Sequence, residues 1–274
     1  MIDRAVAASK PVSDRIGSLR PADSAPIAIL TFSHSGVEIL RDFLASSSAL
    51  CCTTRTGLLP MCESAAATWQ SIEGRERLSA LARSSIRALV TSMTLAQSVT
   101  SGARIADSGA PRWCETTISG TSSAGTFLKI FPQAKFVCFH RRCDEVISEI
   151  IQSNPWGFGK TEFWPYSSAN PGNSVATAGA FWAERSRTIL DFQLAHPQSC
   201  LSLRREDLEA DAQEQMSLVW SFLGLTSPSA VTQQRRDPVV TEHGARPRFP
   251  ADRLPPPLRA VINELHATLG YPPL

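Results

Sequence analysis

The chain has 274 residues, of which 43% are hydrophobic and 19% are charged, and its formal net charge is +2. This composition is that of a globular protein long enough to bury a full core. The small net charge argues against broad nucleic-acid binding, and no apolar run approaches the roughly 18–20 residues of a membrane-spanning helix. We therefore expect no nucleic-acid partner and no membrane segment.

Seven cysteines lie at positions 51, 52, 62, 114, 138, 143 and 200. Their number is odd, their spacing matches no zinc pattern, and several lie in apolar runs typical of strands. We therefore expect reduced core thiols in a cytoplasmic protein, and no metal site. The N-terminus lacks the apolar core of a signal peptide, which agrees with that location.

The first predicted unit is a strand, a tight turn and a helix. Residues 1–25 are rich in Ala, Ser and Pro and are interpreted as a flexible arm. Ile27 to Phe32 is an apolar run that predicts a buried strand, and Ser33-His34-Ser35-Gly36 forms a turn-prone link. A helix then starts near Gly36. Such a turn directs backbone N–H groups and the positive helix end at an anion, so it is a candidate phosphate or phosphosulfate site; the alternative is an ordinary β-to-α turn.

The middle of the chain has helical periodicity between residues 60 and 100. The predicted elements are helices from Met61 to Ile72, from about Arg75 to Val99 and from Ser119 to Phe131, and a short strand from Arg112 to Glu115. Residues 51–59 are interpreted as irregular.

A second strand–turn–helix unit begins at Lys135. Lys135 to His140 predicts a buried strand, and Arg141-Arg142-Cys143-Asp144 opens the helix that follows. Each unit thus has a polar turn at the carboxyl end of its strand, where open parallel sheets bind their ligands.

The last third of the chain opens with an aromatic segment. Residues 154–174 are interpreted as a long lid-like loop, with an anchored surface loop as the alternative. The elements predicted after it are a helix over 175–195, a strand over 199–203, a helix to about 223 and a last helix over 257–269. Alternating strands and helices indicate an α/β fold with a central parallel sheet flanked by helices, formed by one domain over residues 26–274.

Several segments in order resemble the sulfotransferases that use 3′-phosphoadenosine 5′-phosphosulfate. They are T-F-S-H-S-G-V-E at the first turn, F-P-Q-A-K-F-V-C-F-H-R-R-C-D-E-V-I-S at the second unit, L-S-L-R-R-E-D-L-E-A-D with the later F-L-G-L, and L-G-Y at 269–271. The resemblance covers roughly residues 26–271 and implies the P-loop-like sulfotransferase fold.

The chain departs from the family pattern at several anion-binding positions. His34 stands where relatives usually have Lys or Arg, Val37 and Glu38 stand where they have Ser or Thr, Thr116 stands where they often have Lys, and Glu149 stands where they often have Ser. Because Glu38 adds a negative charge beside an anion, it would weaken donor binding unless it turns away or is neutralised.

The resemblance also implies roles for individual residues. The donor would be bound by Ser33, Ser35, Gly36 and Val37 at its 5′-phosphate (through the amides of the last three), by Arg141 and Ser148 at its 3′-phosphate, and by Arg246 or Arg248 over the nucleotide. His34 would contact the transferring group. Glu115 is the first candidate base and His34 the second; the alternative for Glu115 is a surface or helix-capping carboxylate.

Three functions follow from this reading. The first is transfer of a sulfuryl group from 3′-phosphoadenosine 5′-phosphosulfate to a hydroxyl or amine of a small molecule, such as a secondary metabolite, in a mostly apolar pocket. The second is another reaction on the same scaffold, with His34, Glu38 and Glu115 as an acid–base cluster. The third is a non-catalytic binding protein. A homodimer is left open.

Overall fold

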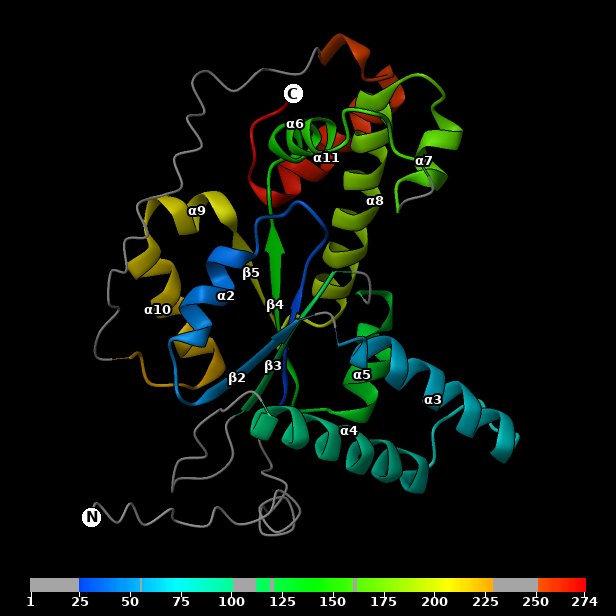
Figure 1. The fold of residues 1–274 in the computed structure, drawn as a ribbon, viewed down its shortest axis with the longest axis vertical. Helices are drawn as coiled ribbons and strands as arrows, with labels where there is room; N and C mark the ends of the chain where they lie inside the picture. The colour runs from blue at the N-terminus through cyan, green and yellow to red at the C-terminus, as the bar shows by residue number, and fades with distance from the viewer. Residues whose placement is uncertain (1–24, 55, 101–111, 119–120, 160–161, 229–250) are drawn as a thin grey trace, which may run out of the picture.

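Figure 1 shows the chain in a computed structural model, which describes residues 25–54, 56–100, 112–118, 121–159, 162–228 and 251–274. Its centre is a sheet of five parallel strands in the order β2-β3-β1-β4-β5. The strands are β1 (Ile27–Leu30), β2 (Leu50–Thr54), β3 (Arg112–Thr117), β4 (Lys135–His140) and β5 (Cys200–Arg204). The predicted α/β fold with a central parallel sheet is confirmed.

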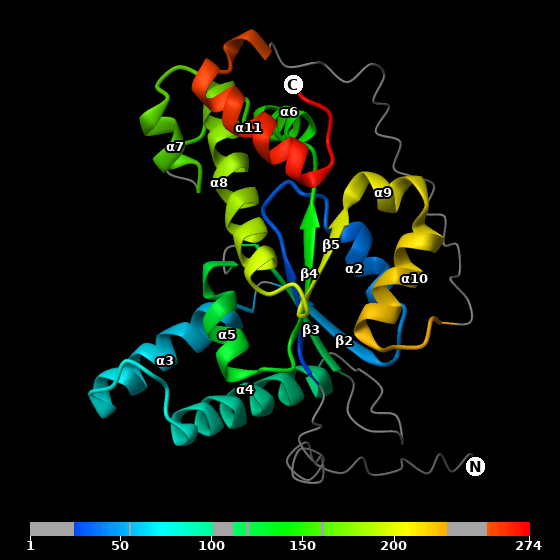
Figure 2. The ribbon, with the colours of Figure 1, turned by 180° about the vertical axis from the view of Figure 1, so that it is seen from behind.

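Helices cover both faces of the sheet (Figures 1 and 2). One face packs against α2 (Glu38–Ala45), α9 (Arg205–Ala210) and α10 (Ala212–Leu223). The core on the other face contains α3 (Leu58–Glu73), α5 (Ala124–Ile130) and α8 (Ser174–Ala195). α4 (Ala80–Thr100) packs on α3 and α5, and α6 (Cys143–Ser153) and α11 (Pro256–Leu269) pack on α8. The short α7 (Trp164–Ala169) packs on α8, and single 3₁₀ turns lie at Thr121–Ser123 and Ala251–Arg253.

The central strand β1 shows why an uninterrupted apolar run forms a strand here. All four of its residues are fully buried. Ala28 and Leu30 face the core on one side of the sheet, whereas Ile27 and Ile29 face the core on the other. Successive side chains of a strand point to opposite faces, so a strand covered on both faces needs apolar residues at every position.

Three predicted segments differ from the structure. Residues 51–59 were expected to be irregular, but β2 lies there; it is an edge strand whose last residue, Thr54, is exposed, so it needs no long apolar run. The 154–174 segment contains α7, in which Pro165 lies in the first turn, where proline is compatible with a helix. The helix predicted from Ser119 to Phe131 begins as a 3₁₀ turn and becomes α5 only at Ala124. The predicted N-terminal arm falls outside the described residues, except for Ala25.

All seven cysteines lie in the described residues, and none of them forms a disulfide bond. Cys52 and Cys200 are half-buried and the other five are buried. The expectation that most of the cysteines lie in the core is confirmed. Within the described segments, no helix is both long and apolar enough to cross a membrane.

The sheet order places a crevice at the carboxyl ends of β1 and β4. These strands are neighbours, but the chain leaves β1 toward β2 on one side and leaves β4 toward β5 on the other. The Thr31 hydroxyl donates to the carbonyl oxygen of Phe139 at 3.2 Å, which ties the two strand ends together. Connections that diverge in this way open a crevice that typically binds ligands in α/β proteins.

Candidate active site

The loop after β1 has an unusual backbone at two positions. His34 and Gly36 have φ angles of 63° and 71°, in the left-handed region. This conformation costs a non-glycine residue such as His34 on the order of 1–3 kcal/mol, so the surrounding contacts must hold it. The amide of Ser35 donates to the carbonyl oxygen of Phe32 at 3.3 Å. Ser35 therefore uses its amide within the loop, which differs from the predicted use of that amide for the 5′-phosphate.

Gly36 is required for a second reason, which is the approach of Arg205. A Cβ atom at Gly36 would lie 2.2 Å from Nη1 of Arg205, so the guanidinium group lies directly against the loop backbone. Nε of Arg205 also donates to Oε1 of Glu209 at 2.8 Å. The first residue of α9 thus brings a positive charge to a loop that has no Lys or Arg of its own.

Two hydroxyl groups of this loop have no partner among the described residues. The side-chain oxygens of Ser33 and Ser35 are both buried and make no hydrogen bond there. Buried polar groups are normally satisfied, and an orphaned hydroxyl marks a position where a ligand atom fits. Together with the Arg205 guanidinium, the two hydroxyls suit the oxygens of a bound anion, so the loop fits the 5′ end of a phosphosulfate donor.

Arg141, which follows β4, connects to this loop from the other side of the crevice. Its Nη1 donates to the carbonyl oxygen of His34 at 2.7 Å, and its Nε donates to Glu145 at 3.3 Å. Its Nη1 also forms an ion pair with Glu149, and Trp182 Nε1 donates to its carbonyl oxygen at 2.8 Å. Nδ1 of His34 lies 3.4 Å from Glu149, so the Glu149 carboxylate bridges His34 and Arg141.

The charge around Arg141 is already compensated by the protein. Burial alone would raise the pKa of Glu149, but hydrogen bonds and charge from His34 and Arg141 outweigh it and lower the pKa to about 2. Glu149 is therefore a carboxylate at all physiological pH values. The Glu149 carboxylate lies beside Arg141, where the resemblance implies a 3′-phosphate. Because a phosphate there would meet a negative charge, the surroundings of Arg141 fit a 3′-phosphate poorly.

Ser148 was expected to bind the 3′-phosphate, but its hydroxyl is used within α6. It donates to the carbonyl oxygen of Asp144, one turn earlier, at 2.8 Å. Arg246 and Arg248, the predicted nucleotide-closing residues, lie outside the described residues.

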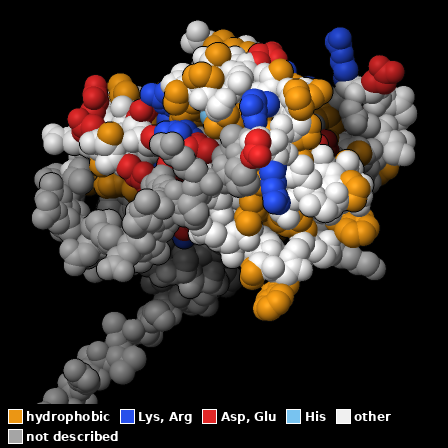
Figure 3. All heavy atoms as spheres, turned by 90° about the horizontal axis from the view of Figure 1, so that it is seen from above, with side chains coloured by type: hydrophobic (Ala, Val, Ile, Leu, Met, Phe, Trp, Pro, Cys, Tyr) orange, Lys and Arg blue, Asp and Glu red, His pale blue; other side chains and the backbone are white. Residues whose placement is uncertain are grey.

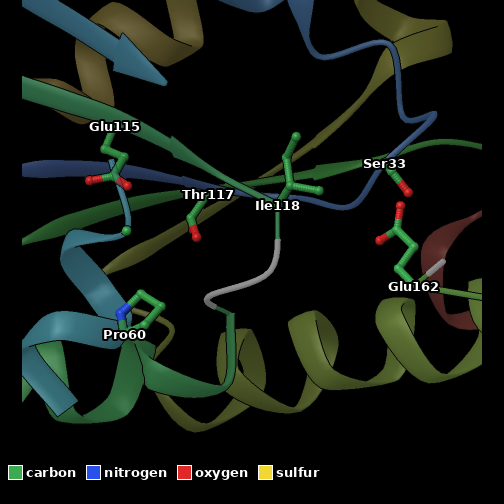
Figure 4. Close-up of a pocket in the computed structure, with 7 residues that line it drawn as sticks. Ser33, Pro60, Glu115, Thr117, Ile118 and Glu162 are labelled. Carbon is green, nitrogen blue, oxygen red and sulfur yellow. The ribbon is translucent and has the colours of Figure 1, made fainter. Parts of the chain in front are cut away.

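Glu115 lies on β3 and lines a pocket of about 300 Å³ (Figure 4). The described residues that line the pocket are Ser33, Gly57, Pro60, Glu115, Thr117, Ile118 and Glu162. Glu115 and Thr117 point to the same face because they are two residues apart on one strand. At the other end of the pocket, Ser33 and Glu162 point toward each other (Figure 4). Ser33 therefore belongs to both the loop after β1 and the pocket.

The environment of Glu115 changes its proton affinity. Glu115 is 1% exposed, and burial raises its pKa to about 6 against the opposing effect of hydrogen bonds from the Thr56 side chain and from the backbone N–H groups of Leu58, Gly57 and Thr56. Its Oε2 atom has no partner within the described part of the chain. A buried carboxylate with a pKa near neutrality and a vacant oxygen suits a general base.

His34 and Glu38 do not join Glu115 in one cluster. The His34 ring faces Glu149 and packs near Phe163, with ring centroids 6.0 Å apart. Glu38 is exposed in the first turn of α2. Neither is among the described residues that line the pocket. The structure therefore does not assemble the proposed acid–base cluster of these three residues.

The face above the strand ends carries charges of both signs (Figure 3). Acidic and basic side chains are mixed over it, with hydrophobic side chains exposed between them. This mixture agrees with the small net charge of the chain and gives no broad basic surface.

Two contributors to the site were not assigned a role from the sequence. Glu162 carries no local signal, because it reaches the pocket only through the fold. Arg205 lies in the L-S-L-R-R-E-D-L-E-A-D segment that carries the resemblance, but nothing local places it against the loop after β1. Glu149 was named as a departure from the family pattern; its spacing of eight residues from Arg141, with Glu145 between them, is what places it beside that arginine.

Comparisons with known proteins agree with this geometry. The model of the sulfotransferase family matches residues 26–229, which is more than half of the chain. No curated protein matches it in sequence.

Solved structures with a similar fold include three sulfotransferases. The sulfotransferase domain from the curacin biosynthetic pathway is 19% identical, with a TM-score of 0.55, over 90% of this chain and 98% of that one. The sulfotransferase domain of the Synechococcus PCC 7002 olefin synthase is 20% identical, with a TM-score of 0.50, over 93% and 98%. Sulfotransferase STF9 from Mycobacterium avium is 12% identical, with a TM-score of 0.50, over 95% and 82%. The fold, the strand-end site and the family match lead to one conclusion: the chain belongs to the sulfotransferase family and is a transferase enzyme.

Proposed function

We propose that the chain transfers a sulfuryl group from 3′-phosphoadenosine 5′-phosphosulfate to a hydroxyl or amine of a small molecule. The observation that carries this proposal is that Ser33 belongs both to the loop after β1 and to the lining of the pocket. Its buried, unpartnered hydroxyl lies in the anion-type loop and also lines the pocket that contains Glu115. A donor in the loop and an acceptor in the pocket would therefore meet at Ser33, which gives the proximity that group transfer needs.

The donor end of the site relies on the loop after β1. The donor supplies the sulfuryl group on a phosphate leaving group. The hydroxyls of Ser33 and Ser35 can hydrogen-bond anionic oxygens, and the Arg205 guanidinium can compensate the negative charge that grows on the leaving phosphate. Because Gly36 has no side chain, the Arg205 guanidinium can lie against the loop that carries these two hydroxyls.

Glu115 is the proposed general base. With a pKa of about 6 it is mostly ionised at pH 7, and its vacant Oε2 can accept a proton. It takes the proton of the acceptor as the acceptor oxygen or nitrogen bonds to sulfur and the bond from sulfur to the phosphate oxygen breaks. The products are the sulfated acceptor and adenosine 3′,5′-bisphosphate.

A small tailoring substrate fits the dimensions of the pocket. Its volume of about 300 Å³ is at the lower end for small-molecule sites. Two of the solved structures with this fold are domains of a biosynthetic pathway and of an olefin synthase, which supports a metabolite as the acceptor. The seven cysteines, none of which forms a disulfide bond in the described chain, are compatible with a reducing compartment such as the cytoplasm.

Isothermal titration with adenosine 3′,5′-bisphosphate tests the donor site. We expect binding in the micromolar range that weakens as salt rises. Arg205→Ala should reduce the affinity about tenfold, because it removes one charge-assisted contact worth roughly 1.4 kcal/mol. Arg187→Ala is the matched control, since Arg187 pairs with Glu264 on the surface, away from the loop. Absence of binding at millimolar ligand would contradict the proposal.

A second candidate is a different group transfer on this scaffold, and Glu149 is the observation that favours it. Its carboxylate takes the place of an anion beside Arg141. For this candidate, the bisphosphate should not bind, yet Glu115→Ala should abolish an activity found by metabolite screening.

A further inference from the structure

The loop after β1 borders a cluster of charged side chains on the side of α6. Nδ1 of His34, which belongs to the loop, lies 3.4 Å from the Glu149 carboxylate, and the Arg141 guanidinium pairs with the same carboxylate. The hydroxyl of Ser35, in the same loop, is buried without a partner in the described chain and marks a position for a ligand anion. A nucleotide whose phosphate binds this loop, and which extends toward Arg141 as the resemblance implies, brings its sugar to Glu149.

The described charges beside α6 do not favour a second phosphate on that sugar. Arg141 already pairs with two carboxylates, those of Glu145 and Glu149. The next arginine, Arg142, pairs with Asp144. Carboxylates therefore outnumber guanidinium groups in this cluster, and a phosphate monoester would add between one and two further negative charges, roughly.

Glu149 is instead placed to accept a hydrogen bond from a sugar hydroxyl. Its Oε1 faces His34 and its Oε2 faces Arg141, whereas a carboxylate can accept about four hydrogen bonds. Its side chain is 41% exposed, so part of the carboxylate is accessible to a ligand. Dinucleotide-binding folds use the same chemistry, since an acidic residue there binds a free ribose hydroxyl and an arginine accommodates a phosphate at that position.

We infer that the site also accepts a sulfuryl donor with a free 3′-hydroxyl, such as adenosine 5′-phosphosulfate, and that Glu149 accepts a hydrogen bond from this hydroxyl. The inference rests on the proposed sulfuryl transfer and adds a second class of donor to it. The bond from sulfur to the phosphate oxygen breaks as the acceptor oxygen or nitrogen bonds to sulfur, and the proton of the acceptor passes to the general base. The nucleotide product is adenosine 5′-phosphate.

Isothermal titration of the full chain with nucleotide products tests the inference without any need for turnover. Adenosine 5′-phosphate should bind at least as tightly as adenosine 3′,5′-bisphosphate, although it carries less charge. 3′-Deoxyadenosine 5′-phosphate should bind about tenfold more weakly than adenosine 5′-phosphate, because it cannot donate to the carboxylate. 2′-Deoxyadenosine 5′-phosphate is the matched ligand, which lacks the other hydroxyl and should keep its affinity.

One substitution connects this preference to Glu149. Glu149→Ser should make the bisphosphate the tighter ligand and should reduce the difference between adenosine 5′-phosphate and its 3′-deoxy analogue. Glu214→Ser is the matched control, because Glu214 is an exposed carboxylate in the first turn of α10, on the opposite face of the sheet. The control variant should keep the wild-type order of affinities.

The possible outcomes separate the inference from the proposed function. If the wild type binds the bisphosphate more tightly than adenosine 5′-phosphate, or binds the 3′-deoxy analogue as tightly as adenosine 5′-phosphate, the inference is overturned and the proposed function stands. If neither nucleotide binds at millimolar concentration, both fail. If adenosine 5′-phosphate binds through its 3′-hydroxyl and Glu149 but the bisphosphate does not bind, the inference stands and the 3′-phosphorylated donor is excluded.

Discussion

At the scale of single residues, the most unusual feature of the site is a carboxylate beside Arg141, where the resemblance implies a 3′-phosphate. Glu149 pairs with Arg141 and lies 3.4 Å from Nδ1 of His34. A ligand phosphate at Arg141 would lie beside the Glu149 carboxylate or would have to displace it, and the two negative charges repel each other. If the 3′-phosphate of the proposed donor binds at Arg141, Glu149 weakens that binding, and without a ligand it links Arg141 to His34.

Replacing this carboxylate should strengthen nucleotide binding. We expect Glu149→Ser to raise the affinity for adenosine 3′,5′-bisphosphate about tenfold, since a hydroxyl removes the repulsion and frees one side of Arg141. Titration of adenosine 5′-phosphate is the control, because a ligand without the 3′-phosphate should gain little. An unchanged affinity for the bisphosphate would show that the 3′-phosphate does not bind at Arg141.

Glu115 gives a prediction about rate and pH. Because its pKa is raised to about 6, the ionised base is lost as pH falls below that value. For the wild type, kcat/KM should fall about tenfold per pH unit below pH 6 and level off above it. Glu115→Gln should lower kcat by roughly 10²–10⁴-fold and remove this limb of the profile. A Glu115→Gln variant with wild-type kcat would exclude Glu115 as the base.

At the scale of elements, the loop after β1 needs glycine at position 36 for two reasons. One is the positive φ angle, and the other is the space that Arg205 occupies. Gly36 and Gly57 both have a φ of 71°, but a Cβ atom at Gly57 would have nothing within 4 Å, whereas one at Gly36 would meet Arg205. The two positions form a matched pair that separates backbone strain from steric contact.

Alanine substitutions at these glycines should differ in their effects. Gly57→Ala should cost about 1 kcal/mol of unfolding free energy, from strain alone. Gly36→Ala should cost more and should also weaken bisphosphate binding at least tenfold, because Arg205 must leave the loop. Urea unfolding and titration measure both. If the two variants were equally stable and bound equally well, the Arg205 contact would be unimportant.

The elements also show what the sequence can predict. β1 and β4 were predicted from continuous apolar runs, because strands buried on both faces need them. β2 was missed because an edge strand pairs on one side only and tolerates its Cys and Thr residues. The sequence indicated part of the candidate site. It pointed to the loop after β1, because that loop follows a recognisable strand, and to Glu115, because Glu115 lies in one. It did not point to Glu162, because nothing local relates that residue to Ser33.

At the scale of the whole molecule, the site exists only through contacts between distant segments. His34 and Arg141 are joined across the crevice at 2.7 Å although 107 positions separate them. The pocket combines β3, the start of α3, the loop after β1 and the segment before α7. Pairings of this kind depend on strand order, which periodicity alone does not reveal. Stability of the fold and integrity of the site are therefore coupled.

Buried titratable groups make that stability depend on pH in opposing directions. His140 is fully buried, and desolvation lowers its pKa from 6.5 to about 4. The unfolded chain therefore binds this proton more readily, and the stability that neutral His140 contributes is lost as pH falls below 6.5. Glu115 has the opposite sign: its pKa is raised from 4.5 to about 6, so its contribution to stability is present at low pH and is lost as pH rises through 6.

Two variants should separate these effects. Between pH 7 and pH 5, linkage gives a loss of about 2 kcal/mol from His140 and a gain of about 1 kcal/mol from Glu115. In urea unfolding over this interval, Glu115→Gln should lose about 1 kcal/mol more than the wild type, and His140→Gln should lose about 2 kcal/mol less. His266, which accepts a hydrogen bond from the Cys143 amide at 3.3 Å and whose pKa is also lowered by burial, adds to the acid sensitivity of all three proteins equally. If both variants followed the wild-type pH dependence, neither group would have a shifted pKa in the folded state, and the raised pKa that makes Glu115 a suitable base would be refuted with it.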